Sequence, residues 1–175
     1  ATQFIPSSIF GYTPEVEPFP YDPERARELL EQAAAEDGFE LPIETTLSYR
    51  DVVRGYLPQP GVVAQDLQAQ LAEVGINVTL DLQESGTFID NSDAGLLSLH
   101  MLGWGADYPD ATNFLDYHFG AGASEQFGEK FPELTSVLAE AAALADPEER
   151  YPLYVEANTL IRDLAPMVPI AHGGS

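Results

Sequence analysis

The sequence contains no cysteine, one lysine (Lys130) and one tryptophan (Trp104). The lack of cysteine excludes disulfide bonds and thiolate metal sites, and it leaves the cellular compartment open. No window of about 18 consecutive apolar residues occurs, so we predict no membrane-spanning helix. The first residues also lack the basic and apolar blocks of a signal peptide. We therefore expect residues 1–20 to be a linker-like segment that leads into a single domain, residues 21–175.

Positive charge is scarce along the whole chain. Seven basic residues face 29 acidic ones, which gives a formal net charge of −22. Such a surface repels nucleic acid and anionic lipid, and we predict no nucleic-acid partner. The simpler interpretation is a solvated acidic coat, tuned to salt. The alternative is a surface that attracts cationic ligands.

Hydrophobic periodicity predicts an alternation of helices and strands. Asp22 followed by Pro23 is typical of a helix start, and so is Asp146 followed by Pro147 with Glu149 three residues after the cap. Between the helices, apolar and polar residues alternate as in strands. The expected helices cover residues 23–38, 63–74, 134–145 and 147 onward, and the expected strands cover residues 43–49, 76–82, 96–102 and 165–174.

This order of elements predicts an α/β fold with a mostly parallel or mixed sheet flanked by helices. The run LLSLHML (residues 96–102) is nearly continuous in apolar residues, so we expect a strand that is buried on both faces. The preceding segment, ESGTFIDNSDAG (residues 84–95), is rich in turn formers, and we expect it to be a turn.

The patterns of common active sites are missing. His100, His118 and His172 are not spaced as metal ligands. DNSDAG (residues 90–95) is not a calcium loop, because Ala94 occupies a ligand position and Met101 stands where the bidentate Glu belongs. No nucleophile elbow, phosphate-binding loop or dinucleotide-binding turn occurs. We therefore predict no catalytic residue, no metal site and no cofactor, and the sequence argues against an enzyme.

The segment that follows residue 102 carries the most distinctive chemistry. It reads GWGADYPDATNF (residues 103–114) and places Trp104, Asp107 and Tyr108 just beyond an expected strand. Ligands of parallel α/β sheets collect at the carboxyl ends of strands, where an indole offers an apolar wall and a carboxylate pairs with a cation. The structural alternative is that Trp104 belongs to the core and Asp107 caps the turn before the next helix.

Four ordered motifs add a resemblance to a known family. They are YDPERARELL (21–30), RGYLPQPGVVAQDLQAQLAEVGINV (54–78), WGADYPDATNF (104–114) and DPEERYPLYVEANTLIRDLAPMVPIAH (146–172). Together they resemble the family 5 extracellular solute-binding proteins, the peptide- and nickel-binding receptors of ABC importers, and the dipeptide branch most of all. Two positions depart from the family pattern: Ala111 and Gly55 stand where proline is common.

The resemblance implies a lobe of the type II periplasmic-binding-protein fold. Family members have two lobes that close on a ligand, and this chain resembles most of the second one, which would pair with an N-terminal lobe. It implies that Asp107 holds the amino group of a peptide, that Trp104 lines a side-chain pocket, and that Arg54 reaches the peptide carboxylate. Tyr108, next to Asp107, completes the candidate ligand-binding set.

The implied function is therefore a periplasmic or extracellular, membrane-associated receptor that delivers short peptides to the membrane subunits of an ABC importer. Three alternatives stay open at this point. The same fold could bind another solute, such as a sugar or a metal chelate. It could also be a sensory or catalytic descendant of the fold, or a plain interaction domain with an acidic face.

Overall fold

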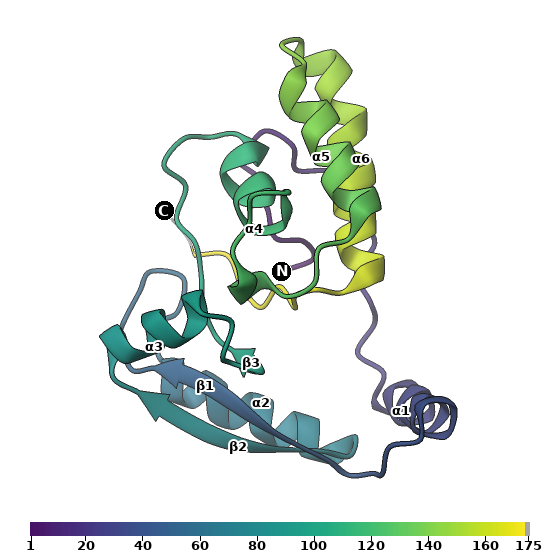
Figure 1. Cartoon of the computed structure of the whole chain (residues 1–175), viewed down its shortest axis with the longest axis vertical. Helices are drawn as coiled ribbons and strands as arrows, with labels where there is room; N and C mark the ends of the chain where they lie inside the picture. The colour runs from purple at the N-terminus through teal and green to yellow at the C-terminus, as the bar shows by residue number, and fades with distance from the viewer. Residues whose placement is uncertain (174–175) are drawn as a thin grey trace. The chain divides into compact units, whose positions relative to one another are not determined.

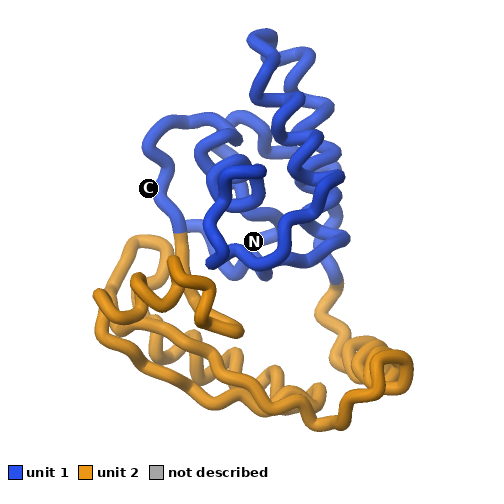
Figure 2. The backbone as a smooth tube through the Cα atoms, in the orientation of Figure 1, with its two compact units in different colours: residues 1–19, 104–175 blue, residues 20–103 orange. Residues whose placement is uncertain are grey.

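The computed structural model describes residues 1–173, and it divides into two compact units (Figure 2). Unit 1 combines Ala1–Phe19 with the part of the chain that starts at Trp104. Unit 2 is Pro20–Gly103. In the described residues, no helix is both long and apolar enough to cross a membrane.

Unit 2 is built around a three-stranded parallel sheet with the strand order β2-β1-β3 (Figure 1). The mostly parallel sheet and the α/β class that the sequence predicted are therefore confirmed, as are the first two helices and the first two strands. The elements of unit 2 are α1 (Pro23–Asp37), β1 (Ile43–Arg50), α2 (Pro60–Glu73), β2 (Ile76–Gln83), α3 (Ser85–Asp93) and β3 (Leu99–His100).

The two faces of the β1–β2 pair differ because side chains alternate along a strand. One face is apolar and packs with α2 into a small core of Leu47, Tyr49, Ala64, Val78 and Met101. The other face is polar: the Ser48 hydroxyl donates to Asp81 at 2.9 Å across the strand pair. This alternation explains why the sequence pattern located both strands.

The segment expected to be a turn is the helix α3. The Glu84 carboxylate caps it by accepting hydrogen bonds from the backbone N–H groups of Gly86 and Thr87. Phe88 is completely buried, and the Arg50 guanidinium lies 5.8 Å from the centre of its ring. Tertiary burial of one aromatic side chain therefore outweighs a local composition that favours turns.

The expected strand at residues 96–102 was also wrong in length and in burial. Only Leu99 and His100 form β3, which pairs with β1 at the edge of the sheet. Leu96 is 70% exposed and Leu99 and Leu102 are also exposed, whereas Met101 is buried. An edge strand that pairs over two residues leaves most of its apolar side chains uncovered within the described residues.

Unit 1 contains mostly helical turns and one long helix pair. Its elements are η1 (Thr112–Asp116, a π-helical turn), α4 (Tyr117–Phe119), η2 (Glu125–Phe127), α5 (Pro132–Ala143) and α6 (Pro147–Leu164). The helices α5 and α6 lie side by side (Figure 1) and bury Leu134, Leu138, Tyr154, Ala157 and Ile161. Asp146 caps α6, as the sequence predicted.

The tail that follows α6 forms no strand over residues 165–173, so this prediction was wrong; Gly174 lies outside the described residues. The tail instead runs beside the start of the chain, where the N-terminal ammonium of Ala1 donates to the Ile170 carbonyl at 2.9 Å and the His172 ring lies 3.0 Å from the Gln3 carbonyl. Pro166 and Pro169 have no backbone N–H, so each would interrupt the backbone hydrogen bonds between this tail and a neighbouring strand.

The expected linker-like segment packs into unit 1. Gln3, Ile5, Thr13 and Val16 are buried, and Ile5 belongs to the main apolar cluster. The buried Asn158 amide of α6 donates to the Gly11 carbonyl at 3.0 Å, which ties this segment to the helix pair. Residues 1–19 therefore differ from a linker, because they supply core side chains and buried hydrogen bonds.

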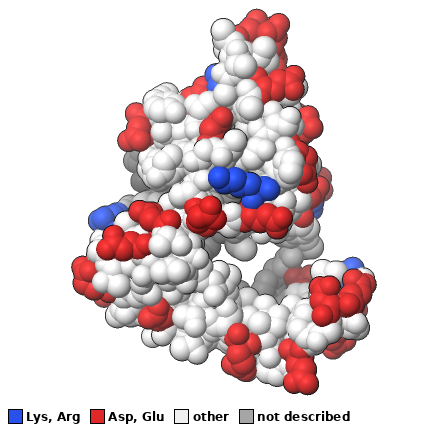
Figure 3. Space-filling model, in the orientation of Figure 1, with Lys and Arg blue, Asp and Glu red and all other residues white. Residues whose placement is uncertain are grey.

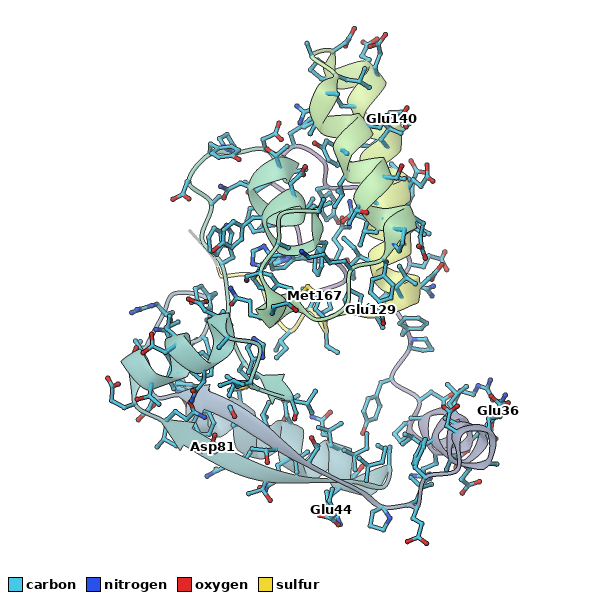
Figure 4. The ribbon with its side chains drawn as sticks, viewed as in Figure 1. Glu36, Glu44, Asp81, Glu129, Glu140 and Met167 are labelled. Carbon is cyan, nitrogen blue, oxygen red and sulfur yellow. The ribbon has the colours of Figure 1, made fainter. Side chains whose placement is uncertain are left out.

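Acidic side chains are spread over the visible surface of both units, with few basic ones among them (Figure 3). The labelled acids Glu36, Glu44, Glu129 and Glu140 in Figure 4 are all exposed. Three ion pairs are found among the described residues, Arg25–Glu28, Arg150–Asp110 and Arg162–Asp163. Most of the negative charge is therefore exposed to solvent without a basic partner.

The packing of the first nineteen residues can be tested with matched substitutions. We expect Ile5→Ala to lower the free energy of unfolding by about 2–5 kcal/mol, because it opens a cavity at a fully buried site. Ile170→Ala removes the same atoms from an exposed site and should cost less than about 1 kcal/mol. Urea denaturation of both variants measures the difference, and equal costs would show that the segment is not part of the core.

Candidate functional site

The candidate loop of unit 1, residues 104–110, is fixed at its start by one amide side chain. The carbonyl oxygen of Asn113 accepts two hydrogen bonds: from the Trp104 indole N–H at 3.0 Å and from the Asp107 backbone N–H at 3.1 Å. Asn113 lies in η1, and it is only 6% exposed. One buried oxygen therefore connects the indole and the backbone beside the candidate carboxylate.

The end of the loop is fixed by an ion pair. The Asp110 carboxylate binds the Arg150 guanidinium through two hydrogen bonds of 2.8 Å, and its Oδ1 also accepts the Thr112 N–H at 3.0 Å. Burial by itself would raise the pKa of Asp110, but the hydrogen bonds from Arg150 and Thr112 hold that pKa below its ordinary value. The capping role considered for Asp107 thus belongs to Asp110.

Asp107 and Tyr108 lie on the exposed part of the loop. Tyr108 is 49% exposed, and its hydroxyl accepts a hydrogen bond of 3.3 Å from Thr112. The Asp107 side chain is also exposed, and within residues 1–173 its carboxylate forms no hydrogen bond or ion pair. This carboxylate is free to meet a cationic group from outside the chain.

Trp104 is half-buried in a group of aromatic rings. Its indole stacks on the Tyr117 ring with centroids 4.3 Å apart and an interplanar angle of 25°. The His118 ring is nearly perpendicular to the indole, with the two ring centroids 5.1 Å apart. Tyr117 is itself 49% exposed. Tyr117 and Asn113 were not predicted as site residues from the sequence, because no local pattern shows which side chains meet the indole.

His118 is a structural member of this group. Burial lowers its pKa to about 4, and its Nδ1 lies 2.7 Å from the Phe114 carbonyl oxygen. The imidazole is therefore neutral at neutral pH, and Nδ1–H donates to that carbonyl. The cavity beside His118 has a volume of about 10 Å³, which is room for a single water molecule.

Asp116, at the end of η1, is an acid without a hydrogen bond to its buried oxygen. Its Oδ2 has no partner within the described residues. Burial and the nearby negative charge of Asp110 raise the pKa of Asp116 to about 6, although the Arg150 charge acts in the opposite direction. Asp116 therefore ionises near neutral pH at a cost to the folded state.

Arg54, the fourth candidate, belongs to unit 2. It begins a tight turn in which the backbones of Arg54 and Leu57 exchange hydrogen bonds of 3.2 and 3.0 Å. Its guanidinium is exposed and donates only to the Val53 carbonyl, at 3.3 Å, so within the described residues it does not pair with Asp51. The structure thus places Trp104, Asp107 and Tyr108 on one loop and Arg54 on the other unit.

The turn of Arg54 borders an open hollow in unit 2. The hollow has a volume of about 410 Å³, and it lies where β1 ends and α2 begins. In the same turn, the Tyr56 ring packs against Gly103 so closely that a Cβ atom at Gly103 would collide with it. Residues Asp51, Pro58, Gln59, Pro60, Gly61, Val62 and Gln65 line the hollow.

Each of the three histidines contacts different groups. His100 is 3.4 Å from the Ser92 hydroxyl, and burial lowers its pKa. His118 and His172 contact backbone carbonyls of unit 1. In residues 1–173 no group of three or more His, Asp or Glu side chains is placed to hold a metal ion.

Comparison with known proteins identifies the family of the chain. Residues 1–126 match the model of the bacterial extracellular solute-binding proteins, family 5 (middle region). The chain belongs to this family. It is 35% identical, over 172 residues, to di/tripeptide-binding protein 4 of Pseudomonas aeruginosa (strain UCBPP-PA14), and the match covers 95% of this chain and 31% of the relative.

Two further relatives show the range of family 5. The heme-binding protein A of Haemophilus influenzae is 32% identical over 171 residues, which cover 96% of this chain and 30% of the relative. The ABC transporter-associated periplasmic binding protein of Helicobacter pylori, solved in complex with the peptide STSA, superimposes with a TM-score of 0.86 at 29% identity. That match covers 98% of this chain and 33% of the other.

These matches confirm the type II periplasmic-binding-protein class that the sequence resemblance implied. They also confirm membership of the solute-binding family 5. The chain spans about a third of the length of the relatives that it matches.

The raised pKa of Asp116 predicts how stability depends on pH. Below about pH 4 the carboxyl is protonated in both the folded and unfolded states, so it contributes nothing. As the pH rises through about 6, the unfolded chain loses the proton more readily, and the folded state loses stability. Asp116→Asn removes this penalty, so we expect the variant to be more stable than wild type at neutral pH but not at acidic pH.

Solvent screens this half-buried carboxylate, which reduces the expected gain at about pH 7 to roughly 1–2 kcal/mol. Urea denaturation of the variant and of wild type, at neutral and at acidic pH, measures this gain in the free energy of unfolding. Glu140→Gln, which neutralises an exposed acid on α5, is the control for a general relief of negative charge. A gain from Asp116→Asn that is the same at both pH values would contradict the assignment.

Proposed function

We propose that this chain is the ligand-binding lobe of an extracytoplasmic solute receptor that delivers short peptides to an ABC importer. The observation that carries the proposal is the exposed, unpaired Asp107 carboxylate, which is held beside Trp104 on a loop fixed at both ends. In this proposal Asp107 binds the peptide's free amino group, and Trp104 and Tyr108 contact its first residues.

The charges of a peptide suggest which groups could bind its two ends. A short peptide is a zwitterion, and a closed cleft that excludes water must replace the solvation of both its ends. Asp107 supplies the anion for the ammonium group, and the exposed Arg54 guanidinium supplies the cation for the carboxylate. The rest of the protein, as an N-terminal lobe, would close over the ligand against this chain.

The relatives support this assignment by what they bind. One is named for di- and tripeptides, and the Helicobacter pylori protein was solved with a bound peptide. We propose that the protein binds without catalysing a reaction, and that it acts in the periplasm or outside the cell, at the membrane that holds the importer subunits. A peptide recovered unchanged from the complex supports binding, whereas turnover supports a catalytic descendant of the fold.

A second candidate ligand is a planar apolar molecule such as heme. The heme-binding relative of Haemophilus influenzae supports it, and so does the stacked pair of Trp104 and Tyr117, whose rings could contact a flat surface. The two candidates separate in one titration series. Binding of heme changes its absorption spectrum. If the protein binds peptide and not heme, this spectrum stays unchanged; if both bind at the same site, added peptide displaces the heme.

The role of Asp107 gives a sharp test in the full-length receptor. We expect Asp107→Asn to weaken the binding of a dipeptide such as Ala-Leu by about 2–4 kcal/mol, because it leaves the buried ammonium group without its counter-charge. N-acetylated Ala-Leu should lose a similar amount of affinity for the wild type. Isothermal titration calorimetry measures both.

The control for this test is Asp163→Asn, which removes one negative charge from an exposed site at the end of α6. Both variants change the total charge by the same amount. Asp163→Asn should nevertheless bind Ala-Leu like wild type, because Asp163 is not part of the candidate loop. If acetylation of the peptide leaves its affinity unchanged, Asp107 does not hold an amino group.

The role of Arg54 is tested through the other end of the peptide. We expect Arg54→Ala to weaken the binding of Ala-Leu more than that of its C-terminal amide, since only the free acid offers a carboxylate to the guanidinium. Arg25→Ala, on the exposed surface of α1, is the matched loss of one arginine. An equal loss for acid and amide would assign Arg54 a structural role.

A further inference from the structure

We infer that Asn113 is the positioning residue of the ligand-binding loop. Its single carbonyl oxygen accepts from both the Trp104 indole and the Asp107 backbone, and so it fixes the aromatic wall and the carboxylate relative to each other. This inference rests on the proposed peptide-binding function. Asn113 itself does not contact the ligand; it acts through the two residues that do.

The chemistry of the two partners identifies the atom involved. Both partners are N–H groups, and each can only donate, so the oxygen of the Asn113 amide must face them. A carbonyl oxygen has two lone pairs, and the two donors occupy both. An apolar residue of the same size at this position would leave the indole N–H and the Asp107 N–H without their acceptor.

The place of Asn113 in the fold makes the acceptor rigid. It lies in the π-helical turn η1 between Ala111 and Phe114, which are both buried in the core of unit 1. The Asn113 side chain is 6% exposed, so its rotamers are restricted by packing. A rigid acceptor holds both donors in place before a ligand arrives, which lowers the entropic cost of binding.

The other restraints on the loop do not reach Asp107. The bidentate pair with Arg150 fixes Asp110, and the Thr112 hydroxyl contacts the Tyr108 hydroxyl. Across residues 105–109, all within the described chain, the Asp107 N–H is the one amide that has a hydrogen-bond acceptor. Loss of the Asn113 oxygen therefore frees the part of the loop that carries the carboxylate.

The first measurement needs no ligand. Hydrogen–deuterium exchange of residues 105–109 in the full-length receptor reports on the Asp107 amide, and we expect Asn113→Leu to speed its exchange by about tenfold or more. Asn158→Leu is the matched control, because Asn158 is a second buried asparagine of unit 1 that bonds Gly11 and Tyr154. It should lower stability and leave exchange of this segment as in wild type.

The second measurement separates positioning from general stability. In wild type, Ala-Leu should bind about tenfold or more tightly than N-acetyl-Ala-Leu, because Asp107 recognises the free amine. Asn113→Leu should weaken Ala-Leu binding and bring this ratio close to one. Asn158→Leu should keep the wild-type ratio within about twofold, measured below its melting temperature.

Conservative replacement provides the rescue. Asn113→Asp keeps an acceptor oxygen, so exchange of the Asp107 amide should remain slow, and Asn113→Ala takes the place of Asn113→Leu if the leucine variant does not fold. Unchanged exchange together with an unchanged affinity ratio in Asn113→Leu would overturn the inference. If wild type binds neither peptide, the proposed function fails, and the exchange result still decides whether Asn113 positions the loop.

Discussion

The contacts of the Arg150 guanidinium hold together the parts of unit 1 around the candidate loop. It binds the Asp110 carboxylate through two hydrogen bonds of 2.8 Å, the Tyr154 hydroxyl at 2.7 Å and the Ala141 carbonyl at 3.2 Å. It also lies 5.1 Å from the centre of the Phe10 ring. One side chain therefore contacts the candidate loop, both long helices and the N-terminal segment, and removal of either charge would leave a partly buried partner unpaired.

The same pair explains the unusual state of Asp116. Four of the five N–H donors of Arg150 are already used by Asp110, Tyr154 and Ala141, so the guanidinium gives Asp116 charge attraction without a hydrogen bond. Asp110 adds repulsion from the other side. In a chain with seven basic and 29 acidic residues, few cations are available for buried acids, and one acid near this pair remains without a partner.

Periodicity in the sequence predicted the elements whose burial follows their own pattern. The strand β1 alternates apolar and polar residues, and the capped helix α6 begins at Pro147 as expected. The failures share one physical cause, because each depends on contacts far along the chain. Phe88 stabilises α3 by tertiary burial, and only Leu99 and His100 of the expected strand pair with β1. The first nineteen residues pack on helices more than a hundred residues away.

In the candidate site, too, some residues could be predicted from the sequence and others could not. Asp107 and Trp104 could be proposed from the sequence because a carboxylate and an indole follow an expected strand, whereas Arg54 was proposed only from the resemblance to family 5. Asn113 and Tyr117 carry no such chemistry, and they matter only because the chain folds back on the indole. Sequence therefore indicates which groups can meet a ligand, whereas the side chains that orient those groups become visible only when distances are known. For a receptor this second set decides affinity, since a carboxylate that is not held in place must be ordered at the expense of binding.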